Sequence, residues 1–109
     1  HIIGANELRM MRRNAFLINI SRGSAIDEAA LVAALTEGVI GGAGLDVFAT
    51  EPLPAESLLW RLPNVILSPH VAGNTDQYSR RFTDLFLENL ARYRAGEPLR
   101  NVVDLARGY

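Results

Sequence analysis

The chain has 109 residues, of which 49% are hydrophobic and 21% charged, and its formal net charge is −1. This length suits a single domain, and this composition supports a buried core, which excludes a disordered chain. A nearly neutral chain carries no electrostatic sign of a nucleic-acid or membrane partner, so we expect neither. Cysteine is absent, which excludes disulfides and thiolate metal sites.

The sequence also lacks signals for membrane insertion or export. No apolar run approaches the ~18 residues of a membrane span, and the first residues do not have a signal-peptide layout. We therefore expect a cytoplasmic protein. The two histidines lie far apart, so we expect no metal site. The chain opens on His1 in what resembles the middle of a structural unit, and we expect a fragment of a longer chain.

The first part of the chain predicts a helix, a strand and a second helix. The first helix should begin after Asn6, as its N-cap, and end near residues 12–14. Nearly continuous apolar residues over 15–20 predict a fully buried strand. The second helix should begin after Asp27, a good N-cap, and end at Gly38 in the C′ position.

Two more strands and a long helix follow. The strands are predicted over residues 43–48 and 65–67, separated by a proline-punctuated loop with at most one helical turn. The long helix should cover 75–96, leaving 97–109 as a tail without a clear element. Its apolar positions recur at helical spacing: Tyr78, Phe82, Leu85, Phe86, Leu90 and Tyr93.

Strands that alternate with helices predict an α/β fold with right-handed crossovers and a parallel sheet. The glycine-rich stretch at 41–44 precedes a strand, whereas a phosphate-binding G-x-G-x-x-G turn must follow one. We therefore expect these glycines to let a helix and the sheet pack closely. The chain carries no phosphate-binding fingerprint.

Three polar residues follow the three predicted strands. Arg22, Glu51 and His70 should emerge together, because the carboxyl ends of parallel strands share one rim, where ligands bind. Histidine suits acid–base chemistry near neutrality, a carboxylate would orient it, and a guanidinium binds carboxylates through two hydrogen bonds. Each residue also has a structural alternative: a satisfied histidine, a solvated glutamate and a surface ion pair.

Asp46 lies within an otherwise apolar strand. Burying an unpaired carboxylate is unfavourable, so this side chain needs a partner. That partner is either a ligand amide or a structural N–H group, and the sequence leaves both open.

Several motifs together resemble the D-isomer-specific 2-hydroxyacid dehydrogenases. They are LINISRG at 17–23, GLDVF at 44–48 with EP at 51–52, LPNV at 62–65, and SPHVAG at 68–73. They occur in the family's order and spacing over nearly the whole chain. The resemblance implies a three-layer Rossmann-type fold, of which residues 1–109 supply the second half, strands 4 to 6. The long helix would return toward a substrate domain that this chain lacks.

The resemblance also implies roles for the residues at the rim. Arg22 would bind the substrate's carboxylate and 2-oxo group, His70 would donate the proton during reduction, and Glu51 would pair with His70. Asp46 would hold the nicotinamide carboxamide. Residues lining the cofactor would be Ile20, Ser21, Arg22, Asp46, His70 and Gly73.

The function implied is transfer of a hydride between NAD or NADP and a small 2-oxo or 2-hydroxy acid, in a homodimer. The fragment alone would be inactive. The alternative is an NAD(H)-sensing corepressor of the same fold. Two features depart from the family. Leu58 stands where proline is common, and the glycine fingerprint and the acidic residue that binds the cofactor's ribose are absent. Formate dehydrogenases, which resemble this pattern, are disfavoured because they carry glutamine where Glu51 stands.

Overall fold

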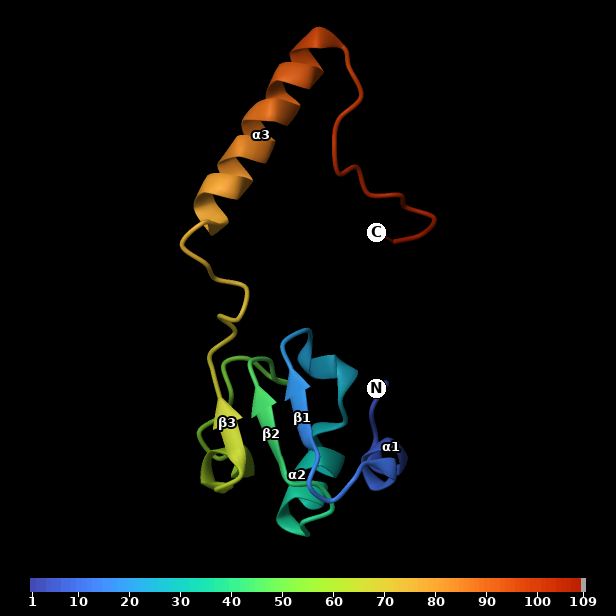
Figure 1. Cartoon of the computed structure of the whole chain (residues 1–109), viewed down its shortest axis with the longest axis vertical. Helices are drawn as coiled ribbons and strands as arrows, with labels where there is room; N and C mark the ends of the chain where they lie inside the picture. The colour runs from blue at the N-terminus through green and yellow to red at the C-terminus, as the bar shows by residue number, and fades with distance from the viewer. Residues whose placement is uncertain (109) are drawn as a thin grey trace. The chain divides into compact units, whose positions relative to one another are not determined.

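The computed structural model describes residues 1–108, which form two compact units. The first unit covers residues 1–73 and the second begins at Asn74 (Figure 1). The α-helices and strands are α1 (Ala5–Met10), β1 (Phe16–Asn19), α2 (Glu28–Thr36), β2 (Gly42–Leu45), β3 (Val65–Leu67) and α3 (Tyr78–Ala95). Two short 3₁₀ turns, Gly23–Ala25 and Leu58–Arg61, complete the described elements.

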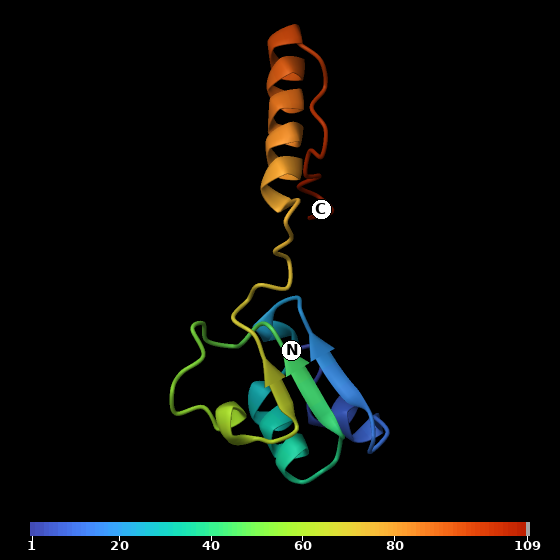
Figure 2. The ribbon, with the colours of Figure 1, turned by 60° about the vertical axis from the view of Figure 1, so that its left-hand side comes forward.

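The first unit is built on a parallel three-stranded sheet in the order β1-β2-β3. Leu17 pairs with Ala43, which in turn pairs with Val65. All three arrows point the same way in Figures 1 and 2. The predicted α/β class and the parallel sheet are confirmed.

Both predicted caps of α2 are present. The Asp27 side chain accepts a hydrogen bond from the Ala30 N–H at 3.0 Å, and Gly38 has the positive φ of 66° typical of a C′ residue. For α1 the prediction was wrong. The N-cap is Gly4, whose N–H donates to the Glu7 carboxylate at 2.8 Å, and Asn6 lies inside the helix.

The core of the first unit lies between α2 and one face of the sheet (Figure 2). Its buried apolar residues are Leu8, Ile26, Leu31, Ala34, Leu35, Ile40, Ala43, Leu45, Phe48 and Leu59. Burial of a leucine, isoleucine or phenylalanine side chain contributes roughly 1.5–3 kcal/mol, so this cluster is what holds the sheet against α1 and α2. Within residues 1–73 the structure thus forms two of the three expected layers.

The strand β1 is not fully buried, contrary to the prediction. Phe16 and Ile18 are 66% and 64% exposed, because they point to the face opposite α2. A continuous apolar run predicts that both faces of a strand are apolar, but it cannot reveal which face has a cover. The strand also ends at Asn19, one residue before the predicted end.

The glycines of β2 make room for the side chains of β1. A Cβ at Gly42 would lie 2.6 Å from both the Phe16 ring and the Asn64 carbonyl oxygen, and one at Gly44 would lie 3.0 Å from Ile18 Cδ1. These glycines therefore make room for side chains of β1 and, at Gly42, for the backbone before β3. The expected role in packing helix against sheet is corrected accordingly.

The second unit consists of α3 and the tail that follows it. The helix begins at Tyr78, three residues after the predicted start, and ends at Ala95, followed by the C-cap Gly96 with a φ of 70°. No residue of α3 is buried. Its exposed side chains include Tyr78, Phe82, Phe86, Leu90 and Tyr93, which are apolar positions that recur at helical spacing in the sequence.

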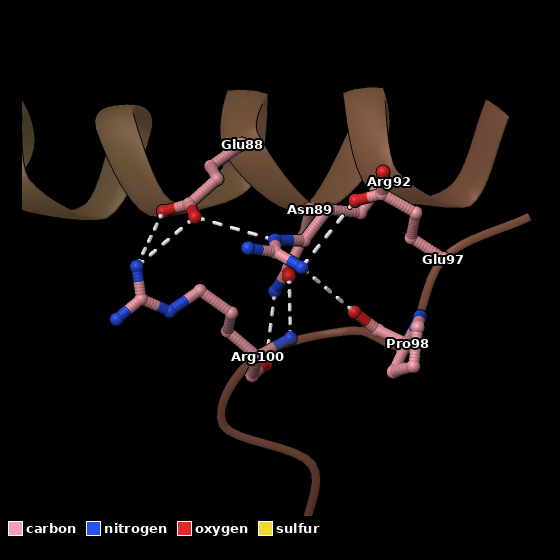
Figure 3. A network of polar contacts seen from close by, with 6 residues as sticks. All are labelled: Glu88, Asn89, Arg92, Glu97, Pro98 and Arg100. Atoms are coloured by element: carbon pink, nitrogen blue, oxygen red, sulfur yellow. Dashed lines mark hydrogen bonds and ion pairs between the residues drawn. The ribbon is translucent and has the colours of Figure 1, made fainter. Parts of the chain in front are cut away.

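Polar contacts fold the tail back along α3 (Figure 3). The Asn89 amide donates to the Arg100 carbonyl at 3.1 Å and accepts from the Arg100 N–H at 2.8 Å. Arg100 also contacts both carboxylate oxygens of Glu88, and Arg92 bonds Glu88 and the Pro98 carbonyl. Residues 97–108 contain no helix or strand, as expected, and Tyr109 lies outside the described residues.

Candidate functional site

The candidate site lies at the carboxyl edge of the sheet. Arg22 follows β1, Asp46 and Glu51 follow β2, and His70 follows β3. Parallel strands carry these residues to the same edge, as predicted for Arg22, Glu51 and His70. The prediction of a strand over 43–48 was wrong, because β2 ends at Leu45 and Asp46 directly follows it.

Glu51 and His70 form the central pair of this site. The distance between His70 Nδ1 and Glu51 Oε2 is 2.6 Å, and the side chains are 46% and 35% exposed. The other oxygen of Glu51 accepts the Phe48 N–H at 3.0 Å. A carboxylate only accepts hydrogen bonds, so Nδ1 carries the hydrogen, and Nε2 is the ring nitrogen left for a ligand.

The surroundings of Glu51 favour its ionised form. The hydrogen bond from His70 is the largest cause that lowers the pKa of Glu51, followed by the Phe48 N–H. The positive charges of His70 and Arg22 contribute further. The contribution of Arg22 shows that the ends of β1 and β2 bring it into electrostatic reach of the pair.

The turn that carries Arg22 is shaped by Asn19, the last residue of β1. The buried Asn19 side chain donates to the Arg22 carbonyl at 3.0 Å and accepts from the Ser21 N–H at 3.1 Å. The Arg22 guanidinium is exposed and donates to the Ser21 carbonyl at 2.7 Å. Among residues 1–108 it forms no ion pair with a carboxylate, so it can still bind an acidic ligand.

Asp46 is buried, and its carboxylate is bonded within the chain. The Ser68 hydroxyl and the Val71 N–H donate to Oδ1 at 2.6 and 2.9 Å, and the Ala72 N–H donates to Oδ2 at 2.8 Å. These bonds, that of Ser68 first, lower the pKa of Asp46. The structural N–H partner considered from the sequence is therefore present. A carboxylate has about four acceptor positions, so one position on Oδ2 remains.

His70 has an unusual backbone conformation. Its φ is 55°, in the left-handed region that residues with a Cβ seldom adopt. The His70 N–H donates to the Ser68 carbonyl at 3.1 Å, which closes a tight turn around Pro69. This turn directs the imidazole toward Glu51.

A pocket of about 610 Å³ lies beside the pair. Its lining is Phe48, Glu51, Pro52, Leu53, Trp60, Leu67, Ser68, Pro69 and His70. Apolar side chains with a few convergent polar groups are typical of small-molecule sites. Arg22 is not part of this lining.

Sequence reasoning did not assign roles to Asn19 and Ser68. Both are polar residues at strand ends, and Asn19 is buried, so each needs a hydrogen-bond partner. That requirement is the signal that could have marked them as residues that shape the site. Ile20, Ser21 and Gly73 lie in the loops after β1 and β3, and their contacts with a cofactor stay predictions.

The fold and the site define a parallel α/β domain with a histidine–carboxylate pair at the carboxyl edge of its sheet. Residues 1–72 match the family model described as the NAD binding domain of D-isomer specific 2-hydroxyacid dehydrogenases. The chain therefore belongs to the D-isomer specific 2-hydroxyacid dehydrogenase family, which confirms the resemblance.

Known proteins of this kind are similar to nearly all of the chain. A glyoxylate reductase of Korarchaeum cryptofilum is 45% identical over 104 residues, which are 95% of this chain and 31% of the relative. A D-isomer specific 2-hydroxyacid dehydrogenase of Xanthobacter autotrophicus, solved with NADPH and MES, is 45% identical with a TM-score of 0.88. That alignment covers 99% of this chain and 44% of the solved one.

A third example is an NADPH-dependent glyoxylate/hydroxypyruvate reductase of Sinorhizobium meliloti, solved with NADP and sulfate. It is 39% identical with a TM-score of 0.88, over 99% of this chain and 35% of the solved chain. The chain spans about a third of the length of the curated relatives it matches. None of the helices among residues 1–108 combines the length and apolar character that crossing a membrane requires.

Proposed function

We propose that this chain supplies the acid–base half of the active site of an NAD- or NADP-dependent oxidoreductase. The reaction is reduction of a small 2-oxo acid to the D-2-hydroxy acid, or its reverse. The observation that carries the proposal is the 2.6 Å contact between Glu51 and His70 at the carboxyl edge of the sheet. The reductases to which the chain is similar support the substrate class.

In this proposal each side chain has one role. Arg22 binds the substrate carboxylate and 2-oxo oxygen through its guanidinium fork. His70 donates a proton from Nε2 to the carbonyl oxygen during reduction and accepts it in the reverse direction. Glu51 accepts the hydrogen bond from Nδ1, so that the ring stays oriented with Nε2 toward the substrate.

A bound reduced nicotinamide would supply the hydride for the carbonyl carbon. The chain offers groups that fit this part of a coenzyme. Asp46 Oδ2 has one acceptor position left for an amide N–H, and residues 20–22 and 70–73 lie exposed at the strand ends. We propose that Asp46 and these two segments, the second of which ends at Gly73, contact the cofactor. We also propose that the whole protein is a homodimer in the cytoplasm.

The test is a steady-state assay of the full-length subunit that carries this segment. Glyoxylate, hydroxypyruvate and pyruvate are offered with NADH and with NADPH, and coenzyme oxidation is followed by absorbance. Turnover that is lost in His70→Ala supports the proposal. Tight NADH binding without turnover of any 2-oxo acid would instead favour the corepressor. We expect the 109-residue chain alone to be inactive.

Glu51→Gln separates orientation from charge in the same assay. Glutamine can still accept the hydrogen bond from His70, but it carries no negative charge beside the ring. Under the proposed function, kcat for reduction should therefore fall in Glu51→Gln although the ring stays oriented. An unchanged kcat would show that the charge of Glu51 does not serve His70.

A further inference from the structure

Three donors to Asp46 lie on both sides of His70 in the sequence. The Ser68 hydroxyl comes from two residues before it, and the Val71 and Ala72 N–H groups come from the two residues after it. Asp46 itself is fixed, because it directly follows β2, is 3% exposed and donates its N–H to the Asn19 carbonyl at 3.0 Å. A rigid carboxylate thus holds the whole turn that presents the histidine.

The conformation of this turn needs such support. A left-handed φ is unfavourable for a residue with a Cβ, and it persists only where the surroundings impose it. His70 is 46% exposed at its side chain and lies in a loop, so packing of the ring does not impose it. The bonds to Asp46 fix the backbone after the residue and the Ser68 side chain before it, beside the backbone bonds of Ser68 to Leu45 and of His70 to Ser68.

We propose that Asp46 is a positioning residue for His70. Its carboxylate holds residues 68–72 in the turn that gives His70 its left-handed backbone, and this backbone brings Nδ1 to Glu51. The effect on catalysis rests on the proposed function, whereas the effect on the Glu51–His70 contact concerns this chain alone. Asp46 therefore acts on the reaction through His70, in addition to any contact with a coenzyme.

The substitution Asp46→Asn is the direct test in the full chain. It replaces one acceptor oxygen by an NH₂ group, which faces a backbone N–H and cannot accept from it. Asp27→Asn is the matched control, because it makes the same change in a carboxylate that also accepts a backbone N–H but caps α2. Both variants lose one negative charge.

Two measurements report on the turn and on the pair. Hydrogen exchange resolved to single residues follows the Val71 and Ala72 amides, and ¹³C NMR of labelled glutamate follows the titration of Glu51. In Asp46→Asn we expect exchange about 10- to 100-fold faster at these amides, the range that loss of a charged hydrogen bond implies. The pKa of Glu51 should rise, because the contact with His70 loosens. Asp27→Asn should leave both unchanged.

Faster exchange with an unchanged Glu51 titration would overturn the proposal, since Asp46 would then stabilise the loop without affecting the contact between Glu51 and His70. If Asp46→Asn unfolds the chain, Ser68→Ala removes a single donor and keeps the carboxylate. It should raise the pKa of Glu51 by a smaller amount, and Ser68→Thr, which keeps a hydroxyl, should restore it. No shift in the folded Ser68→Ala variant would equally overturn the proposal.

The kinetic arm uses the full-length subunit. Positioning predicts that Asp46→Asn lowers kcat for 2-oxo acid reduction at saturating coenzyme. A defect that disappears at saturating coenzyme would assign Asp46 to coenzyme binding and overturn its role toward His70. If the wild type shows no turnover, the proposed function fails, while the exchange and titration measurements still decide the positioning role.

Discussion

The backbones of Gly23 and Phe48 touch. A Cβ at Gly23 would lie 1.9 Å from the Phe48 carbonyl oxygen, which no side chain can occupy without displacing the backbone. Gly23 directly follows Arg22, and the Phe48 N–H donates to Glu51. Glycine at this position therefore lets the loop that bears Arg22 approach the turn that bears Glu51.

Gly23→Ala should separate these two loops. Overpacking against the backbone typically destabilises a protein by about 1–3 kcal/mol, and we expect a loss in this range. Urea unfolding of the full chain measures it. Gly73→Ala is the control, because a Cβ there would meet no atom within 4 Å, and its effect should stay within about 0.5 kcal/mol. Equal stabilities of the two variants would contradict the close approach.

His70→Ala should raise the pKa of Glu51, because it removes the largest of the causes that lower it. A carboxyl whose pKa is lowered by folding adds stability above its unfolded pKa, and this stability is lost as the pH falls through the folded pKa. The variant should therefore lose less stability on acidification across that range. NMR titration and acid unfolding check the two effects.

Glu88 is an internal reference for this titration. Its pKa is lowered by hydrogen bonds from Arg100 in the tail and, to a smaller extent, from Arg92 on α3. His70→Ala should leave the titration of Glu88 in place. A parallel shift of Glu51 and Glu88 would indicate a general loss of structure and contradict the specific effect of His70.

Arg22→Lys should not be a conservative change under the proposed function. A lysine ammonium cannot reproduce the two parallel hydrogen bonds of a guanidinium to a carboxylate. We expect kcat/KM for 2-oxo acids to fall about 10- to 100-fold, as loss of one charged hydrogen bond implies, with NADH affinity nearly intact. Arg13→Lys, an exposed site before β1, is the control. Equal losses of kcat/KM and NADH affinity would indicate a structural arginine.

The purified 109-residue chain should self-associate. Phe16, Ile18 and Ile66 are 64–78% exposed on strands of the same sheet, and Ile20, just beyond β1, is 65% exposed. Exposed apolar strands favour pairing with another chain. Sedimentation velocity at increasing concentration measures this. A clean monomer that unfolds cooperatively at low micromolar concentration would show that the chain closes its own core.

A paired substitution tests where this association occurs. Ile18→Thr with Ile66→Thr keeps the β-branched shape of the strands and adds hydroxyls to the exposed face, so it should reduce association. Tyr93→Ser on α3 is the comparison. If only the α3 change reduces association, the helix face is responsible instead of the sheet.

Local signals in the sequence predicted local structure well. The caps of α2 at Asp27 and Gly38 depend on residues within one turn, and β3 has the predicted bounds because Pro63 and Pro69 flank a short apolar run. Asn6 was a wrong N-cap, because the Glu7 side chain bonds the Gly4 N–H and starts α1 earlier.

Long-range contacts in the site were only partly predictable. Strand order placed Glu51 and His70 at one edge, but nothing in residue spacing could show that Asp46 bonds residues 22 to 26 positions later. The same limit applies to Phe16 and Ile18. Their apolar character is visible in the sequence, whereas the lack of a cover depends on what else packs against the sheet.

The paired hydrogen bonds between Asn89 and Arg100 determine which substitutions each of these two positions tolerates. The Asn89 amide bonds only the backbone of residue 100, donating to its carbonyl and accepting from its N–H, so these two bonds do not require arginine there. Position 89 is far less tolerant. Aspartate has the same shape but cannot donate, and it would set a negative oxygen against the Arg100 carbonyl. A single deamidation at residue 89 would therefore remove the bond to the Arg100 carbonyl, whereas a replacement of Arg100 would keep both bonds to Asn89 and lose only the ion pair with Glu88.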